Sequence, residues 1–255
     1  MLALDIVNIT ATISTIVLLF SPFPDFRQIH TEKNTGEVRI LPVLMLCVNC
    51  FTWAMYGYLS GAYFPVLSIN AAGTLTSLAF STVFYRWSSN RAALHKMGAA
   101  ILSWMVLVIA FVVLCRSDVL SISSDIQEKI VGYLAVILNI CLYASPLQTM
   151  KLVLSTKSAA SLPAMMCCVN LVNGSLWVLY GILANDMFVL TPNALGVALS
   201  AIQVMLCIKY RSKGETSGGN VKGDVSVTVS PVIDFVKTPV YEVIDLTVEK
   251  EKALC

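Results

Sequence analysis

The chain has 255 residues, of which 57% are hydrophobic and only 13% are charged, and its formal net charge is +2. With a mean hydropathy of +0.78 it is too apolar for a water-soluble domain of this length, so the composition places it in a lipid bilayer. Its basic residues lie in short loops between apolar runs and form no single patch, so nucleic-acid binding is not indicated.

Seven apolar runs are each long enough to cross a membrane, because a hydrocarbon core of about 30 Å needs about 20 apolar helical residues. The first run lacks a basic start and a small-residue cleavage site, so we interpret it as a retained span rather than a signal peptide. We therefore predict an all-α membrane protein with spans at residues 5–26, 40–58, 63–85, 97–115, 129–151, 162–184 and 187–210.

Lysine and arginine are distributed unevenly between the two faces that these spans define. The loops after the first, third, fifth and seventh spans carry most of them, whereas the opposite face has only Arg116 and Lys129. By the positive-inside rule, we expect the N-terminus outside and the C-terminus in the cytoplasm.

One sequence pattern occurs twice. The stretches L-S-I-N-A-A-G and L-T-P-N-A-L-G place Asn70 and Asn193 at a spacing of 123 residues (193 − 70 = 123). A W-x-x-Y-G stretch precedes each of them and begins at Trp53 and Trp177, at a spacing of 124 (177 − 53 = 124). Repeated offsets of this kind indicate an internal duplication.

The duplication predicts a 3+1+3 plan. Three spans reverse the direction of the chain, so an unpaired fourth span is needed before a second three-span copy can lie parallel to the first, as in transporters built from parallel repeats. We predict two triple-helix bundles at residues 1–86 and 129–211, with an inversion-linker helix within 87–128. Residues 212–255 are polar, and we expect a disordered cytoplasmic tail there.

Two short patterns in the tail are typical of partner binding, although both are common by chance. Tyr241 to Ile244 reads as a tyrosine-type sorting signal, and Val243 to Thr247 resembles a short partner-binding strand.

The predicted spans contain no residue pattern typical of catalysis, ion coupling or nucleotide binding. No charged residue lies well inside a predicted span, which argues against proton or sodium coupling, and no phosphate-binding loop is present. His30 and His95 are expected in solvated loops, and the C-x-x-C pair Cys47 and Cys50 is expected to pack as small hydrophobic residues. We therefore predict no enzyme activity, no cofactor and no metal.

The polar groups left inside the membrane are duplicated at matching depths. Asn70 and Trp53 are expected at one depth in the first half, as are Asn193 and Trp177 in the second, so all four can converge on the axis between the halves. Amides donate and accept hydrogen bonds while indoles offer flat apolar faces, which suits a sugar. Alternatively, the asparagines bond helices together and the tryptophans form an interfacial belt; the duplication favours the binding site.

Residues that lie above and below the predicted binding site along the membrane normal are candidates for the outer and inner gates of a transport path. Tyr56 and Tyr180 follow the tryptophans by one turn and can close the outer face, with Asp186 as either a tyrosine partner or an ordinary loop carboxylate. Four prolines near the cytoplasmic ends can hinge an inner gate, although two of them, Pro42 and Pro163, can also be simple helix-start residues. The four are Pro22, Pro42, Pro146 and Pro163.

Together these motifs resemble the SWEET sugar transporters, in the group that includes the SemiSWEET and PQ-loop proteins. The resemblance covers residues 5–210 and rests on S-P in the first span, Y-G at Tyr56, N-A-A-G at Asn70, Y-A-S-P-L from Tyr143, L-P at Pro163, W-V-L-Y-G from Trp177 and T-P-N-A-L-G from Thr191. It implies a facilitative, bidirectional uniporter that works by alternating access. It also implies sugar binding by Asn70 and Asn193, ring stacking on Trp177, and homo-oligomers in the plasma membrane or, alternatively, an endomembrane.

One position departs from the family pattern. Trp53 stands where many plant members carry a smaller residue such as serine, so the pocket is expected to be narrow and to prefer a monosaccharide such as glucose over sucrose. The nearest rival is a PQ-loop carrier of amino acids or other small solutes, although Pro146-Leu147-Gln148 interrupts the adjacent P-Q. A seven-span receptor is the more distant alternative, because receptors do not show a 3+3 duplication.

Overall fold

The computed structural model describes residues 2–210 apart from residues 37, 118, 120, 160 and 161. Within these residues the chain is helical and contains no strand. Seven segments are long and apolar enough to cross a membrane, as the sequence predicts: Leu2–Glu32, Leu41–Leu59, Tyr63–Trp87, Arg91–Arg116, Ser124–Thr156, Ala164–Leu183 and Met187–Tyr210. The two tail patterns between Tyr241 and Thr247 lie outside the described residues.

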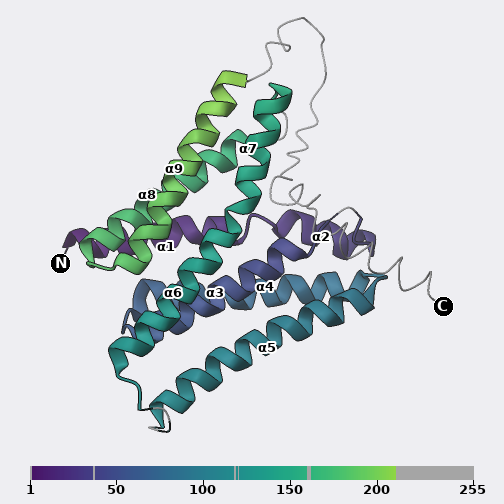
Figure 1. Ribbon diagram of the computed structural model, residues 1–255. Helices are drawn as coiled ribbons and strands as arrows, with labels where there is room; N and C mark the ends of the chain where they lie inside the picture. Colours follow the sequence, from purple (N-terminus) through teal and green to yellow (C-terminus); the bar gives the residue numbers. More distant parts are fainter. Residues whose placement is uncertain (1, 37, 118, 120, 160–161, 211–255) are drawn as a thin grey trace, which may run out of the picture.

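The first, third and fifth spans are each built from two helical segments (Figure 1). Several spans also run past their predicted apolar limits: the first continues to Glu32, the fifth to Thr156, and the fourth begins at Arg91. The segments in chain order are α1 (Leu2–Leu19), α2 (Phe23–Glu32), α3 (Leu41–Leu59), η1 (Tyr63–Leu67), α4 (Ser68–Trp87), α5 (Arg91–Arg116), α6 (Ser124–Leu142), α7 (Ala144–Thr156), α8 (Ala164–Leu183) and α9 (Met187–Tyr210).

Backbone geometry repeats at the same offset as the sequence. Lys33 and Lys157 end α2 and α7 in the left-handed conformation, with φ of 56° and 50°. Gly61 and Asn185 take φ of 72° and 54° in the short turns before the last span of each half. Glycine and asparagine are the residues that adopt this conformation most readily, so the turns are encoded in both copies.

The last span of each half packs against the other two spans of that half. In the first half α4 contacts α1, α2 and α3, and in the second half α9 contacts α6, α7 and α8. Two contacts join the halves reciprocally, because α1 packs on α8 and α3 packs on α6. The fourth span, α5, lies along α3 outside this arrangement (Figure 1).

The hydrophobic core is joined at one end of the molecule and divided at the other. At the end that carries Asp186, which we call the Asp186 end, one cluster unites both halves and includes Trp53, Tyr56, Trp177 and Tyr180. At the opposite end, the α2/α7 end, one cluster belongs to the first half and a separate one to the second. Accordingly, α2 and α7 diverge from each other in Figure 1.

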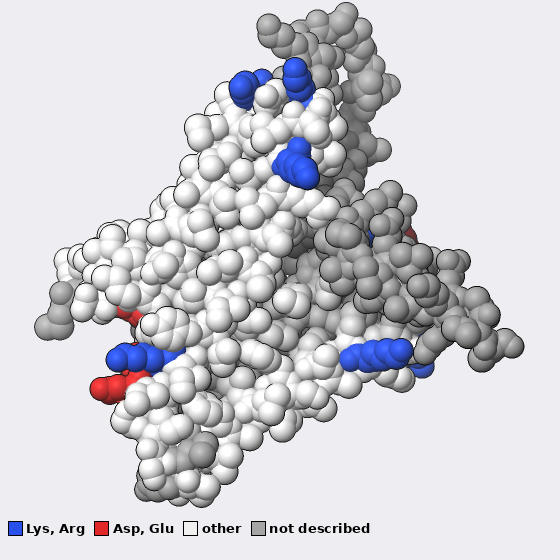
Figure 2. All heavy atoms as spheres, in the orientation of Figure 1, with Lys and Arg blue, Asp and Glu red and all other residues white. Residues whose placement is uncertain are grey.

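The lateral surface is suited to lipid rather than water. Large apolar side chains are exposed along the spans, for example Leu107 at 66% and Ile208 at 74%. Figure 2 shows wide uncharged faces, with lysine, arginine and acidic side chains confined to the extremities. A water-soluble monomer rarely exposes apolar patches of this extent, so the described spans form a membrane-embedded bundle.

A candidate substrate cavity between the two repeats

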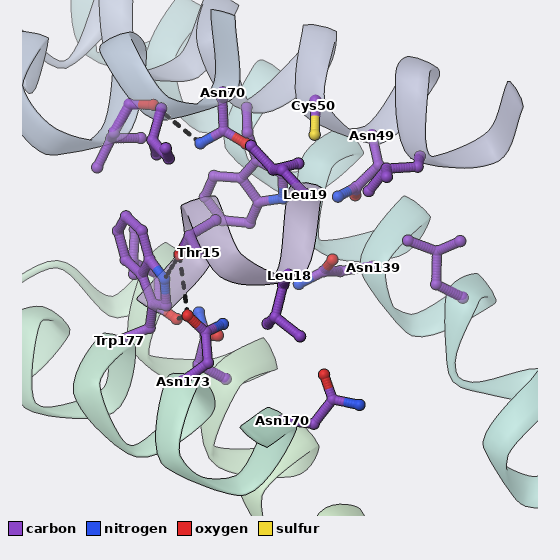
Figure 3. Close-up of a pocket in the computed structure, with 17 residues that line it drawn as sticks. Thr15, Leu18, Leu19, Asn49, Cys50, Asn70, Asn139, Asn170, Asn173 and Trp177 are labelled. Carbon is purple, nitrogen blue, oxygen red and sulfur yellow. Dashed lines mark hydrogen bonds between the residues drawn. The ribbon is translucent and has the colours of Figure 1, made fainter. Parts of the chain in front are cut away.

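A cavity of about 320 Å³ lies where the two halves meet, and side chains from both repeats surround it (Figure 3). The four residues predicted to bind substrate, Asn70, Asn193, Trp53 and Trp177, all line it. The remaining lining residues are Thr15, Leu18, Leu19, Leu46, Asn49, Cys50, Val66, Ile69, Asn139, Leu142, Asn170, Asn173 and Val189.

The two repeat asparagines make the same hydrogen bond in both halves. The amide of Asn70 donates to the carbonyl of Val66, and that of Asn193 donates to the carbonyl of Val189, each at 2.8 Å. Each amide is therefore held by its own helix, one turn back. One N–H and the carbonyl oxygen of each side chain remain to serve a ligand in the cavity.

Trp53 lines the cavity on the wall of the first half and Trp177 on the wall of the second half, and both belong to the core cluster of the Asp186 end. Each makes an edge-to-face contact with the tyrosine that follows it, Trp53 with Tyr56 and Trp177 with Tyr180, at the same ring-centroid distance of 5.5 Å. The indole N–H of Trp177 donates to the hydroxyl of Thr15 at 2.9 Å. In the described part of the chain, Trp53 has no matching bond, so the two walls share a shape but differ in polarity.

Four further asparagines line the cavity, and sequence reasoning missed them. Asn49 and Asn173 lie one turn before the two tryptophans at the repeat offset of 124, which is the signal that identifies them; Asn139 and Asn170 offer no such pairing, because Thr15 and Leu46 stand at the equivalent positions. The four are Asn49, Asn139, Asn170 and Asn173.

Asn49 and Asn173 differ in how their polar atoms are satisfied. The Oδ1 atom of Asn173 accepts from the hydroxyls of Ser14 and Thr15, at 2.7 and 2.9 Å. Asn49 is 8% exposed, and its Oδ1 has no hydrogen-bond partner among the described residues. The Oδ1 of Asn49 is therefore enclosed without a partner in this conformation, whereas Asn173 is occupied in orienting α1 and Trp177.

Tyrosine and aspartate close the cavity at the Asp186 end. The hydroxyl of Tyr56 donates to Asp186 Oδ1 at 2.9 Å, and the same oxygen accepts the backbone N–H of Val189 at 3.1 Å. Asp186 therefore caps the start of α9 while holding α3 of the other half. Tyr180 is also buried here, but its hydroxyl forms no bond to Asp186 in the described structure.

A second cavity of about 260 Å³ adjoins the first at the α2/α7 end. It shares Leu46, Leu142 and Asn170 with the first cavity, so the two form one path toward the divergent ends of the halves. Three of the four predicted hinge prolines line it: Pro42, Pro146 and Pro163.

The four prolines do not act alike on the backbone. Pro22 stands at the break between α1 and α2, and Pro146 lies in the first turn of α7, directly after the break that follows α6. Pro42 lies in the first turn of α3 and Pro163 directly precedes α8, where no intrahelical N–H bond is lost. Of the two alternatives for Pro42 and Pro163, the backbone agrees with helix-start positions, and the helix breaks lie in the first and fifth spans. A role of the four prolines in an inner gate stays a prediction.

Of the four residues considered for metal or redox chemistry, Cys50 lines the cavity, whereas Cys47, His30 and His95 do not. Cys47 is a buried free thiol, as is Cys50, which lines the cavity. His95 contacts the Tyr85 hydroxyl at 2.9 Å on the exposed surface, and His30 lies edge-on to Trp87. The described residues contain no group of three or more His, Cys, Asp or Glu side chains that could hold a metal ion.

A family model described as "Sugar efflux transporter for intercellular exchange" matches the chain twice, at residues 5–92 and 129–215. The two matches leave the fourth span between them, in agreement with two copies joined by a single helix. The chain belongs to this family, the MtN3 or SWEET family of membrane transporters, which is not a class of enzymes.

Individual relatives agree with this assignment. The chain is 32% identical to the bidirectional sugar transporter SWEET1b of Oryza sativa subsp. japonica, over 83% of this chain and 80% of the relative. It is 29% identical to the sugar transporter SWEET1 of Drosophila pseudoobscura pseudoobscura, over 85% and 94% of the two chains. The solved structure of a eukaryotic SWEET transporter superposes with a TM-score of 0.68 at 26% identity, covering 82% of this chain and 97% of that one.

Proposed function

We propose that this protein is a facilitative, bidirectional sugar uniporter. The observation that carries the proposal is the neutral cavity between the repeats, in which duplicated amides and duplicated indoles converge. Amides can donate to and accept from sugar hydroxyls, while indoles cover the apolar faces of a pyranose ring. The family description and the printed names of the relatives, which are sugar transporters, support the same substrate class.

Alternating access follows from the divided core. The Asp186 end is closed by the shared cluster and by the bond between Tyr56 and Asp186, while the α2/α7 end opens between two separate clusters. Transport also requires a second state, in which the Asp186 end is open and the α2/α7 end is closed. The halves, residues 1–86 and 129–211, then rock about the central cavity, with helix breaks near Pro22 and Pro146 as the flexible points.

The cavity size supports a monosaccharide. Its volume of about 320 Å³ lies near the lower end of the range of about 300 to 1,000 Å³ that small-molecule sites occupy. Trp53 and Trp177 both line this cavity, and two bulky indoles in one cavity are consistent with a narrow binding site. We therefore propose glucose-like sugars as the preferred substrates over sucrose.

The proposed setting is the plasma membrane, with an endomembrane as the alternative. The basic loops support a cytoplasmic α2/α7 end and an extracellular Asp186 end, with the N-terminus outside. We further propose that the transporter works as a homo-oligomer, with the fourth span, which lies outside the packing of the two halves, as a contact surface.

Counterflow in proteoliposomes tests the function directly. Liposomes loaded with unlabelled glucose should accumulate labelled glucose through the purified protein, equally with and without a pH gradient, and should accumulate labelled sucrose much more slowly. No glucose counterflow would overturn sugar transport. Equal sucrose and glucose rates would overturn the monosaccharide preference alone.

A PQ-loop-type amino-acid carrier is the rival function. A cavity of neutral amides and indoles offers no fixed charge to a zwitterion, which argues against this rival. Labelled amino acids in the same vesicles discriminate the two functions: accumulation that depends on the pH gradient would favour the rival.

A further inference from the structure

The second cavity carries polar groups that the central cavity does not account for. Most of its lining is apolar or proline, but Asn170, Gln203 and Ser145 also line it. Asn170 lines the central cavity as well, so it stands at the junction of the two. A solute that leaves the central cavity toward the α2/α7 end must pass these groups.

Gln203 is the unexplained residue in this cavity. It lies on α9, its side chain is 7% exposed, and it forms no hydrogen bond with another described residue, while its amide atoms reach the surface of the cavity rather than being enclosed. A side-chain amide has two donors and an acceptor, and in Gln203 these atoms face the cavity, where water or a solute can pair with them. The amide of Gln203 is therefore available to form hydrogen bonds with water or with a solute in this cavity.

The equivalent positions in the first half are apolar. Phe80 corresponds to Gln203 at an offset of 123, and its ring stacks on Phe26 at a centroid distance of 4.6 Å. Leu46 corresponds to Asn170 at an offset of 124. The duplicated scaffold therefore presents amides to the path from the second half only, so this polarity is not a by-product of the repeat.

We propose that Asn170 and Gln203 form a second sugar-binding station between the central cavity and the α2/α7 end. The proposal rests on sugar transport as the function. A sugar in this narrow path leaves much of its hydration behind, and the two amides replace some of the lost hydrogen bonds. The station has fewer polar groups than the central cavity, so it binds sugar more weakly. A weakly bound sugar dissociates from the station quickly.

The test replaces the amides without changing side-chain volume greatly. Gln203→Met removes the amide at nearly the same length, and Asn170→Leu installs the residue that the first half has at that position. Each is expected to slow glucose counterflow roughly tenfold, the effect of about one neutral hydrogen bond in the limiting step. Ile202→Leu, at a neighbouring exposed position on α9, is the matched control and should leave the rate unchanged.

Glucose analogues that each lack one hydroxyl distinguish binding from packing. If Gln203 bonds a sugar hydroxyl, the analogue without that hydroxyl is slow in the wild type and is slowed no further by Gln203→Met. Equal slowing of all analogues, or unchanged glucose counterflow in both variants, would overturn the station. A wild-type protein that moves no sugar would instead overturn the proposed function, so the two failures remain distinguishable.

Discussion

At the scale of single residues, the geometry of Asn70 and Asn193 favours substrate binding over helix association. Each amide bonds a carbonyl of its own helix, and among the described residues neither bonds a neighbouring helix. An asparagine that joined helices would donate across the interface. Both side chains instead line the cavity with polar atoms to spare.

Replacing either asparagine should therefore impair transport and leave folding intact. Asn70→Ala and Asn193→Ala are each expected to lower glucose uptake by roughly five- to tenfold, because a bond to the sugar worth about 1 to 1.5 kcal/mol is lost in the transporting state. Surface delivery should stay normal. Thr191→Ala is a suitable control, since Thr191 is exposed on α9 and bonds only Met187 of its own helix. Uptake that survives in both asparagine variants would contradict the assignment.

Trp53 is the residue on which the proposed size limit depends. Trp53→Ser should widen the cavity on the first-half wall and raise sucrose uptake relative to glucose, measured in cells that lack their own carriers. Trp177→Ser should be more damaging, because it also removes the bond to Thr15 and with it the support of α1. If sucrose remained excluded after Trp53→Ser, a different feature would set the limit.

At the scale of helices, the second and last spans of each half pack unusually closely through a glycine. A Cβ atom on Gly57 would lie 2.7 Å from the backbone nitrogen of Leu67, and one on Gly181 would lie 2.9 Å from the Cα of Leu190. The glycine of each W-x-x-Y-G stretch is therefore needed where α3 meets η1 and where α8 meets α9. This contact aligns each tryptophan with its asparagine.

Adding a methyl group at this contact should destabilise the protein. Gly57→Ala and Gly181→Ala are each expected to lower stability by about 1 to 3 kcal/mol through overpacking. Thermal denaturation in detergent would show this as a reduced melting temperature. Gly98→Ala provides the control, because a Cβ there meets nothing within 4 Å and alanine favours the helical conformation of α5. A melting temperature that is unchanged in the Gly57 and Gly181 variants would show that the spans can separate at no cost.

At the scale of the whole molecule, one hydrogen bond across the halves helps to hold the Asp186 end shut. Tyr56 is 1% exposed, and its hydroxyl reaches Asp186 on the other half. Opening that end must break this bond and expose both groups to water. The balance between the two open states therefore depends on this bond.

Tyr56→Phe should shift that balance toward opening at the Asp186 end. Loss of a hydrogen bond to a charged acceptor corresponds to about 1.5 to 3 kcal/mol, or roughly a tenfold or larger change in population. Spin labels at Lys33→Cys and Lys157→Cys, which end α2 and α7, should then report shorter distances as the opposite end closes. The measurement requires serine at the exposed native cysteines, and an unchanged distance distribution would show that Tyr56 does not hold the gate.

Much of the fold was predictable because membrane spans appear in a sequence as long apolar runs, and internal repeats appear as motifs at a constant spacing. The seven spans, the antiparallel pairs and the duplicated motifs all follow from apolar length and from constant offsets. Even the positions of Asn70, Asn193, Trp53 and Trp177 around one cavity follow, since equal offsets in parallel copies place residues at equal depth.

Other features depend on contacts between residues far apart in the chain, which no local pattern encodes. Three features appear only when both halves are packed together: the choice of Tyr56 rather than Tyr180 as partner of Asp186, the enclosed and unpaired Oδ1 of Asn49, and the division of the core at the α2/α7 end. Sequence alone thus determined the spans, the duplication and the level of the site, because these depend on hydropathy and spacing. Tertiary structure alone decided which polar groups are satisfied and which end is closed, because hydrogen bonding and burial are set by neighbours in space.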